Sequence, residues 1–139
     1  MKRNIEVVLN AYHQNYLNGC KLDEDWWAYQ YLHCQVQEEP EQAFENIQKL
    51  VMLSTDKEFL AYVGADIFED LVKEQGEVLF AKIEAESMKN RRFMYAFCFV
   101  WVGESYSFVQ SFRQFKERLV KSFGITDEDS AEKILLKAP

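Results

Sequence analysis

Proline and glycine are scarce in this chain of 139 residues, which contains two prolines and five glycines. An all-β protein of this length would need many tight turns, and these two residues supply most such turns. The three cysteines, Cys20, Cys34 and Cys98, are widely separated and form no CxxC pair. We therefore expect helices joined by short loops, and reduced thiols in a cytoplasmic protein.

Long apolar runs are also missing. The longest candidate, Phe93–Val102, has ten residues, whereas a helix needs roughly 20 to cross a bilayer. The N-terminal stretch MKRNIEVVLNAYHQ lacks the apolar core of a signal peptide. The expectation is a soluble protein with no membrane partner.

Residues that could carry chemistry form no recognisable set. The two histidines, His13 and His33, match no common zinc-ligand spacing with the cysteines. Cys98 lies in an apolar run where a thiol is normally unreactive, and Gly64 and Gly76 form no phosphate-binding loop. We expect no metal, no cofactor, no catalytic residue and no small-molecule substrate.

What the chain does have is apolar residues repeating at helical spacing, separated by residues that cap helices. A capping box of Thr55 and Glu58 predicts a helix start at Asp56, and Gly76 predicts its end. The expected helices cover residues 2–18, 23–39, 40–51, 56–76, 77–89, 92–102 and 107–124. We predict an all-α fold of seven to eight helices in stacked antiparallel hairpins, solenoid-like, with one helical domain over residues 1–125. Residues 126–139 are expected to form a short helix, over 127–136, or a flexible tail.

Charge is unevenly distributed along the chain. Residues 23–90 carry sixteen acidic and five basic side chains, a net charge of −11, against −7 for the whole chain. An acidic middle repels nucleic acid and attracts a basic protein, although it is also typical of a solvated surface. Residues 113–121 carry four basic side chains interrupted by Glu117, which favours a solvent-facing helix surface over nucleic-acid binding.

Two acidic clusters are candidates for a partner-binding surface. One cluster consists of the three acidic residues directly before Trp26 together with Trp26 itself, and the other lies on both sides of Pro40. Carboxylates beside an exposed tryptophan are a common composition for a surface that binds arginine or lysine. The alternative is an ordinary helix start whose carboxylates favour the helix dipole. The candidate residues are Asp23, Glu24, Asp25, Trp26, Glu38, Glu39 and Glu41.

A third acidic group lies on one face of the helix over 56–76. Asp66, Glu69 and Asp70 share that face. Glu69 could pair with Arg91 or Arg92 across a helix hairpin, so Glu69, Asp70 and Arg92 are predicted to form a structural ion pair. A partner contact, or acid–base chemistry by these carboxylates, are the alternatives.

Several of these positions resemble a family pattern. They are Val63-Gly64-Ala65-Asp66-Ile67-Phe68-Glu69-Asp70-Leu71, then Gly76, Ile83-Glu84-Ala85-Glu86, Arg92-Phe93 and Val100-Trp101. Residues 24–103 thus resemble a small, poorly characterised bacterial helical domain with a "G-x-x-E-D-L-L … G … I-E … F-R … V-W" core, although the chain has Arg92-Phe93 where that pattern has Phe-Arg.

Members of that family look like the small stand-alone proteins found beside bacterial toxin genes. The resemblance implies an immunity protein that binds and occludes a cognate toxin domain. The acidic middle suits a basic nuclease as that toxin. The alternatives are a helical adaptor, possibly a homodimer, and an enzyme acting through Asp66, Glu69 and Asp70.

Overall fold

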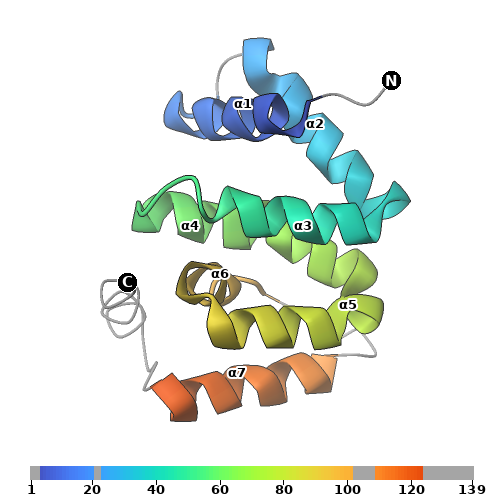
Figure 1. Ribbon diagram of the computed structural model, residues 1–139, viewed down its shortest axis with the longest axis vertical. Helices are drawn as coiled ribbons and strands as arrows, with labels where there is room; N and C mark the ends of the chain where they lie inside the picture. Colours follow the sequence, from blue (N-terminus) through green and yellow to red (C-terminus); the bar gives the residue numbers. More distant parts are fainter. Residues whose placement is uncertain (1–3, 21–22, 102–108, 124–139) are drawn as a thin grey trace.

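The computed structural model describes residues 4–20, 23–101 and 109–123, and within these ranges the regular structure is helical and contains no strand (Figure 1). The prediction of an all-α fold is confirmed. The elements are α1 (Ile5–Leu17), α2 (Asp23–Glu38), α3 (Pro40–Leu50), α4 (Lys57–Val63), the π-helix η1 (Gly64–Phe68), α5 (Glu69–Lys89), α6 (Arg91–Phe97) and α7 (Val109–Phe123).

The helices are stacked in chain order along the long axis of the molecule. Figure 1 shows α1 and α2 at one end, α3 and α4 in the next layer, α5 and α6 below them, and α7 at the other end. Neighbouring elements are in contact: α1 packs on α2 and α3, α2 on α3 and α5, and α5 on α6. The stacked hairpins follow the predicted arrangement.

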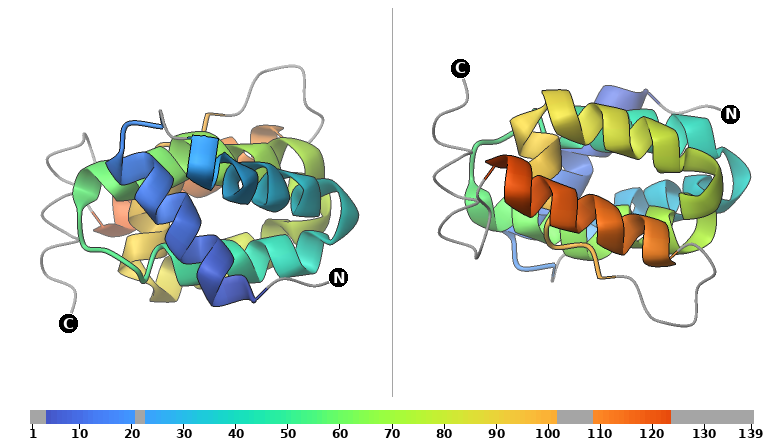
Figure 2. Two further views of the ribbon diagram at one scale, coloured as in Figure 1. Left: turned by 90° about the horizontal axis from the view of Figure 1, so that it is seen from above. Right: turned by 90° about the horizontal axis from the view of Figure 1, so that it is seen from below.

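The segment from α4 to α5 bends sharply. A straight helix from Gly64 to Lys89 would be about 38 Å long, yet the seven-residue α6 that follows contacts both α4 and η1. Figures 1 and 2 show how this is possible, because the second half of α5 turns back and runs in the opposite direction to the first part of the segment. The chain therefore makes a hairpin here without leaving helical structure.

The predicted number of helices is slightly too high. Counted with α4, η1 and α5 as one continuous helix, the described residues form six helices, because α5 continues through Gly76 instead of ending there. The predicted helix over 127–136, the tail 126–139 and the start of the helix over 107–124 lie outside the described residues.

Helix ends follow the capping chemistry, with one correction. Gly19 adopts φ 71° after α1, and the Gly19 and Cys20 amides donate to the carbonyls of Tyr16 and Asn15, as in a Schellman motif. The cap of α4 is Asp56, whose carboxylate accepts from the Glu58 amide, so the predicted cap at Thr55 is one residue early.

The apolar run expected to be one helix over 92–102 is helical only in its first part. Helix α6 ends at Phe97, and the chain then turns. The Trp101 backbone amide donates to Glu69 Oε1 at 2.8 Å, which draws the chain toward α5 after the turn. Glu69 of α5 therefore fixes the backbone at Trp101, after the turn that follows α6.

Aromatic side chains fill the core between the layers. Phe68 packs on Phe93 with ring centroids 4.7 Å apart. Phe112 of α7 packs edge-on against Phe80 of α5 at 4.9 Å, and Phe97 of α6 lies 5.3 Å from Phe115. Helix α7 is therefore held to α5 and α6 by ring contacts. None of the helices described is both long and apolar enough to cross a membrane.

Candidate functional site

The acidic residues predicted to bind a partner lie at two ends of one helix. Asp25 and Trp26 are in the first turn of α2, whereas Glu39 follows its last residue. At 1.5 Å per residue, Asp25 and Glu39 are about 21 Å apart along the helix axis. The backbones of Asp23 and Glu24 belong to the first turn of α2, and their side chains lie outside the described part of the structure. The seven candidates therefore form two patches, as their spacing implied.

In the patch at the start of α2, the tryptophan already has a ring partner. Trp26 is 41% exposed and stacks on Tyr29 with centroids 4.4 Å apart. Tyr29 in turn contacts the His33 ring at 4.2 Å. One face of Trp26 is covered by the protein itself, so this patch offers less aromatic surface than the sequence suggested.

The second patch, which we call the acidic corner, consists of Glu38, Glu39, Glu41 and Glu45 at the junction of α2 and α3. Pro40 begins α3 directly after α2 ends, so the chain turns here without a loop. All four glutamates are exposed. Glu41 forms an ion pair with Lys82 of α5, which ties the corner to the rest of the stack.

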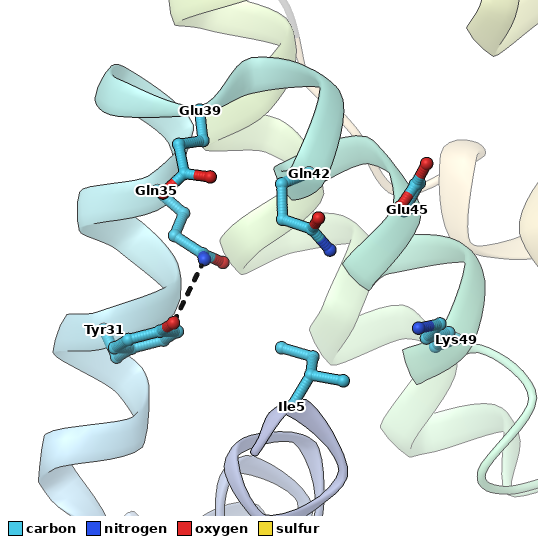
Figure 3. Close-up of a pocket in the computed structure, with 7 residues that line it drawn as sticks. All are labelled: Ile5, Tyr31, Gln35, Glu39, Gln42, Glu45 and Lys49. Atoms are coloured by element: carbon cyan, nitrogen blue, oxygen red, sulfur yellow. Dashed lines mark hydrogen bonds between the residues drawn. The ribbon is translucent and has the colours of Figure 1, made fainter. Parts of the chain in front are cut away.

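A hollow of about 290 Å³ opens beside the acidic corner (Figure 3). It lies between the start of α1, the second half of α2 and the exposed side of α3. Its lining residues are Ile5, Tyr31, Gln35, Glu39, Gln42, Glu45 and Lys49. Among the described ion pairs, none involves Glu39, Glu45 or Lys49.

A chain of hydrogen bonds links three lining residues of this hollow through the buried Asn46. Gln42 Nε2 donates to Asn46 Oδ1 at 3.1 Å, Asn46 Nδ2 donates to Gln35 Oε1, and Gln35 Nε2 donates to the Tyr31 hydroxyl at 3.3 Å. Asn46 and Gln35 are buried. Because each amide is held by the next, these side chains are fixed before anything binds.

The predicted ion pair of Glu69, Asp70 and Arg92 is not formed, because each residue has another partner. Glu69 pairs with Lys73 at 3.3 Å and accepts from the Trp101 amide. Arg92 Nη1 donates to the Met52 carbonyl at 3.3 Å. The bend in α5 places α6 so that Arg92 faces the end of α3 and Glu69 faces the turn after α6.

Asp70 belongs instead to a cluster that the sequence analysis did not identify. His33 of α2 lies between two carboxylates: Nδ1 is 2.8 Å from Asp70 Oδ2, and Nε2 is 3.3 Å from both oxygens of Asp66. The Tyr12 hydroxyl donates to Asp66 Oδ2 at 2.6 Å. The cluster joins α1, α2, η1 and α5.

Both ring nitrogens of His33 face carboxylate oxygens, so both contacts are hydrogen bonds only when the ring carries two protons. Burial alone would lower the pKa of His33, but the hydrogen bonds and charges of Asp66 and Asp70 outweigh it and raise the pKa above 6.5. The folded protein therefore keeps the His33 ring protonated to a higher pH than an ordinary histidine.

Tyrosines surround the same cluster. Burial, followed by the Asp66 charge, raises the pKa of Tyr29 to about 12. The same causes raise the pKa of Tyr12 well above 10 and also that of Tyr62. These phenols stay protonated at neutral pH, so the Tyr12 hydroxyl remains a donor to Asp66. In the described part of the chain, no group of three or more histidine, cysteine or acidic side chains is arranged to hold a metal ion.

The sequence contained one signal for this cluster. Asp66 and Asp70 are four residues apart and were expected to share a helix face, which they do. His33 lies at helical spacing from Tyr29, on the partly buried side of α2. A histidine on an inward face, in a chain with two carboxylates on another helix face, could have suggested the contact.

Comparison with known proteins gives one match. Residues 16–113 match the model of a family of unknown function, DUF6869. The match contains the acidic corner, most of the hollow and the His33 cluster except Tyr12. No curated protein and no solved structure matches the chain.

Proposed function

We propose that this chain, which belongs to the DUF6869 family of unknown function, is an immunity protein that binds and occludes a basic toxin domain through its acidic corner. The observation that carries the proposal is the group of exposed carboxylates around an open hollow at the α2–α3 junction. The proposal includes a cytoplasmic location, which the three free cysteines support.

Charge supports this mode of binding. The net charge of −11 over residues 23–90 produces a long-range attraction for a basic surface, and such attraction raises the association rate. The four carboxylates of the acidic corner are exposed, so a partner surface reaches them without rearrangement of the fold. Binding would then cover the partner's basic active surface.

Charge reversal at the corner tests the proposal. The partner is the product of the neighbouring gene, co-expressed and purified with this protein. We expect Glu39→Lys to slow association about tenfold at low ionic strength, because it replaces an attraction by a repulsion. The measurement is stopped-flow association at several salt concentrations, and the difference between the variant and the parent protein should shrink as salt rises.

Asp25→Lys is the matched control, since it makes the same charge change at the other end of α2. We expect it to slow association less than Glu39→Lys does, because Asp25 lies about 21 Å from the corner. Equal effects of the two substitutions would mean that only net charge matters. A larger effect of Asp25→Lys would move the interface to the start of α2.

A further inference from the structure

We propose that the hollow beside the acidic corner receives one arginine side chain of the basic partner. This inference rests on the proposed function for the class of partner. It goes further by assigning the residue type that enters the hollow and the side chains that hold it: Glu39, Glu45, Gln42 and Tyr31.

Two carboxylates supply the charge that a guanidinium requires. Glu39 lines the hollow at the end of α2, and Glu45 lines it at the second turn of α3 (Figure 3). Neither forms an ion pair within the described structure. Both are exposed, so neither carries the cost of a buried unpaired charge before the partner arrives.

The chain of hydrogen bonds beside the hollow supplies an oriented acceptor. The chain of donors runs from Gln42 through Asn46 and Gln35 to Tyr31, so it begins at the Gln42 amide. Gln42 uses its NH₂ group as a donor to Asn46, which leaves its Oε1 as an acceptor at the hollow. A planar guanidinium has five donors and can address this oxygen and the two carboxylates together, whereas an ammonium has three donors at one point.

The remaining lining suits the arginine stem. The Tyr31 ring and the Ile5 side chain lie at the foot of the hollow, opposite Gln42 in Figure 3. A guanidinium stacks favourably on an aromatic ring, and the methylene groups of the arginine side chain pack on apolar side chains. A volume of about 290 Å³ is large enough for one such side chain.

Lys49 allows a substitution whose expected effect on arginine binding is opposite to that of the carboxylate substitutions. It lines the same hollow but carries the same charge as the proposed guest. Removing it should strengthen binding of arginine, while removing either carboxylate should weaken it. A hollow that merely traps small molecules would not show these opposite effects.

The test uses the purified protein and three blocked peptides, Ac-Gly-Arg-Gly-NH₂, Ac-Gly-Lys-Gly-NH₂ and Ac-Gly-Cit-Gly-NH₂, where citrulline keeps the shape of arginine without its charge. Binding is followed by NMR through the side-chain amide signals of Gln35, Gln42 and Asn46. We expect the arginine peptide to shift these signals, the lysine peptide to bind several-fold more weakly, and the citrulline peptide to cause no change.

Variants then assign the contacts. Glu39→Gln and Glu45→Gln should each weaken binding of the arginine peptide by about fivefold, and Lys49→Met should strengthen it. Glu39 makes no side-chain capping bond to α3, so its replacement leaves the helix start intact. Glu74→Gln, an exposed carboxylate on α5, is the matched control and should change nothing.

The inference is overturned if the arginine peptide leaves the three amide signals in place, or if citrulline shifts them equally. These results are independent of the toxin. A complex with the neighbouring gene product whose formation does not depend on Glu39 or Glu45, together with silent peptides, would remove the arginine site and keep the immunity function. Binding of the arginine peptide by a protein that forms no complex with the neighbouring gene product would keep the arginine site and remove the immunity function.

Discussion

Replacing Gly64 with alanine is expected to lower the free energy of unfolding by about 3 kcal/mol. A Cβ added at Gly64 would lie 1.9 Å from the Ala96 carbonyl oxygen and 2.9 Å from the carbonyl carbon. Both are backbone atoms of α6, so relief requires η1 and α6 to move apart. That movement would open the contacts of Phe68 with Phe93 and Phe97, which fill the same interface.

The steric clash and helix propensity predict opposite changes in the stability of Gly64→Ala, so a measurement of stability distinguishes them. Helix propensity alone would make alanine about 1 kcal/mol better than glycine inside a helix. The neighbouring exposed Ala65 provides the control, because Ala65→Gly should cost about 1 kcal/mol through propensity without any steric clash. Denaturant unfolding of both variants measures the effects. A Gly64→Ala protein as stable as the parent, or more stable, would contradict the close approach of η1 and α6.

The second large effect expected is a loss of stability at alkaline pH that depends on His33. The pKa of His33 is raised in the folded protein, so the protonated ring stabilises the fold. This contribution is complete below the unfolded value of 6.5 and is lost as pH rises through the higher folded pKa. The free energy of unfolding should therefore fall over the range that begins near neutral pH.

Substitution of His33 should remove this dependence. Glutamine at position 33 keeps a donor nitrogen but carries no positive charge. We expect His33→Gln to lower the free energy of unfolding by about 2 kcal/mol at pH 6, because Asp66 and Asp70 then lie close together without a cation between them. The cost should shrink as pH rises. The groups that face His33 are Asp66 from η1, Asp70 from α5 and the Tyr29 ring from α2, with Tyr12 of α1 bonded to Asp66.

His13 is the control for this experiment, since it is the other histidine and packs on Phe59 at 4.4 Å. In the described part of the structure it has no carboxylate partner. We expect His13→Gln to change stability only through that ring contact and to leave the slope against pH as it is in the parent protein. Denaturant unfolding at pH 5.5, 7 and 8.5 gives the slope of the free energy of unfolding against pH for the parent protein and for each of the two variants. An unchanged slope in His33→Gln would contradict the assigned role of the imidazolium.

The helices were largely predictable because their signals are local. Apolar spacing and cap residues depend on neighbours within a few positions, so the all-α fold and the start of α3 at Pro40 followed from the sequence. The limits of local signals appear at Gly76. A glycine at that place was a reasonable helix end, but the structure keeps helical geometry through it and reverses direction by bending.

The ion pairs were harder to predict because they depend on which helix faces which. The shared face of Asp66 and Asp70 was evident from their spacing, but their partner His33 is more than 30 residues earlier in the chain. Glu69 and Arg92 were paired on the assumption of a simple hairpin between neighbouring helices. The bend in α5 invalidates that assumption, since it places Arg92 at Met52 and Glu69 at Trp101.

The most direct test of a partner-binding acidic corner is a hydrogen-exchange comparison of the free protein with its complex with the neighbouring gene product. We expect a 1:1 complex in which amides in residues 35–49, from the end of α2 through α3, become protected. A complex that protects α7 or the start of α2 and leaves residues 35–49 unchanged would contradict the assigned surface. The absence of a complex with a toxic neighbour would contradict the immunity function itself.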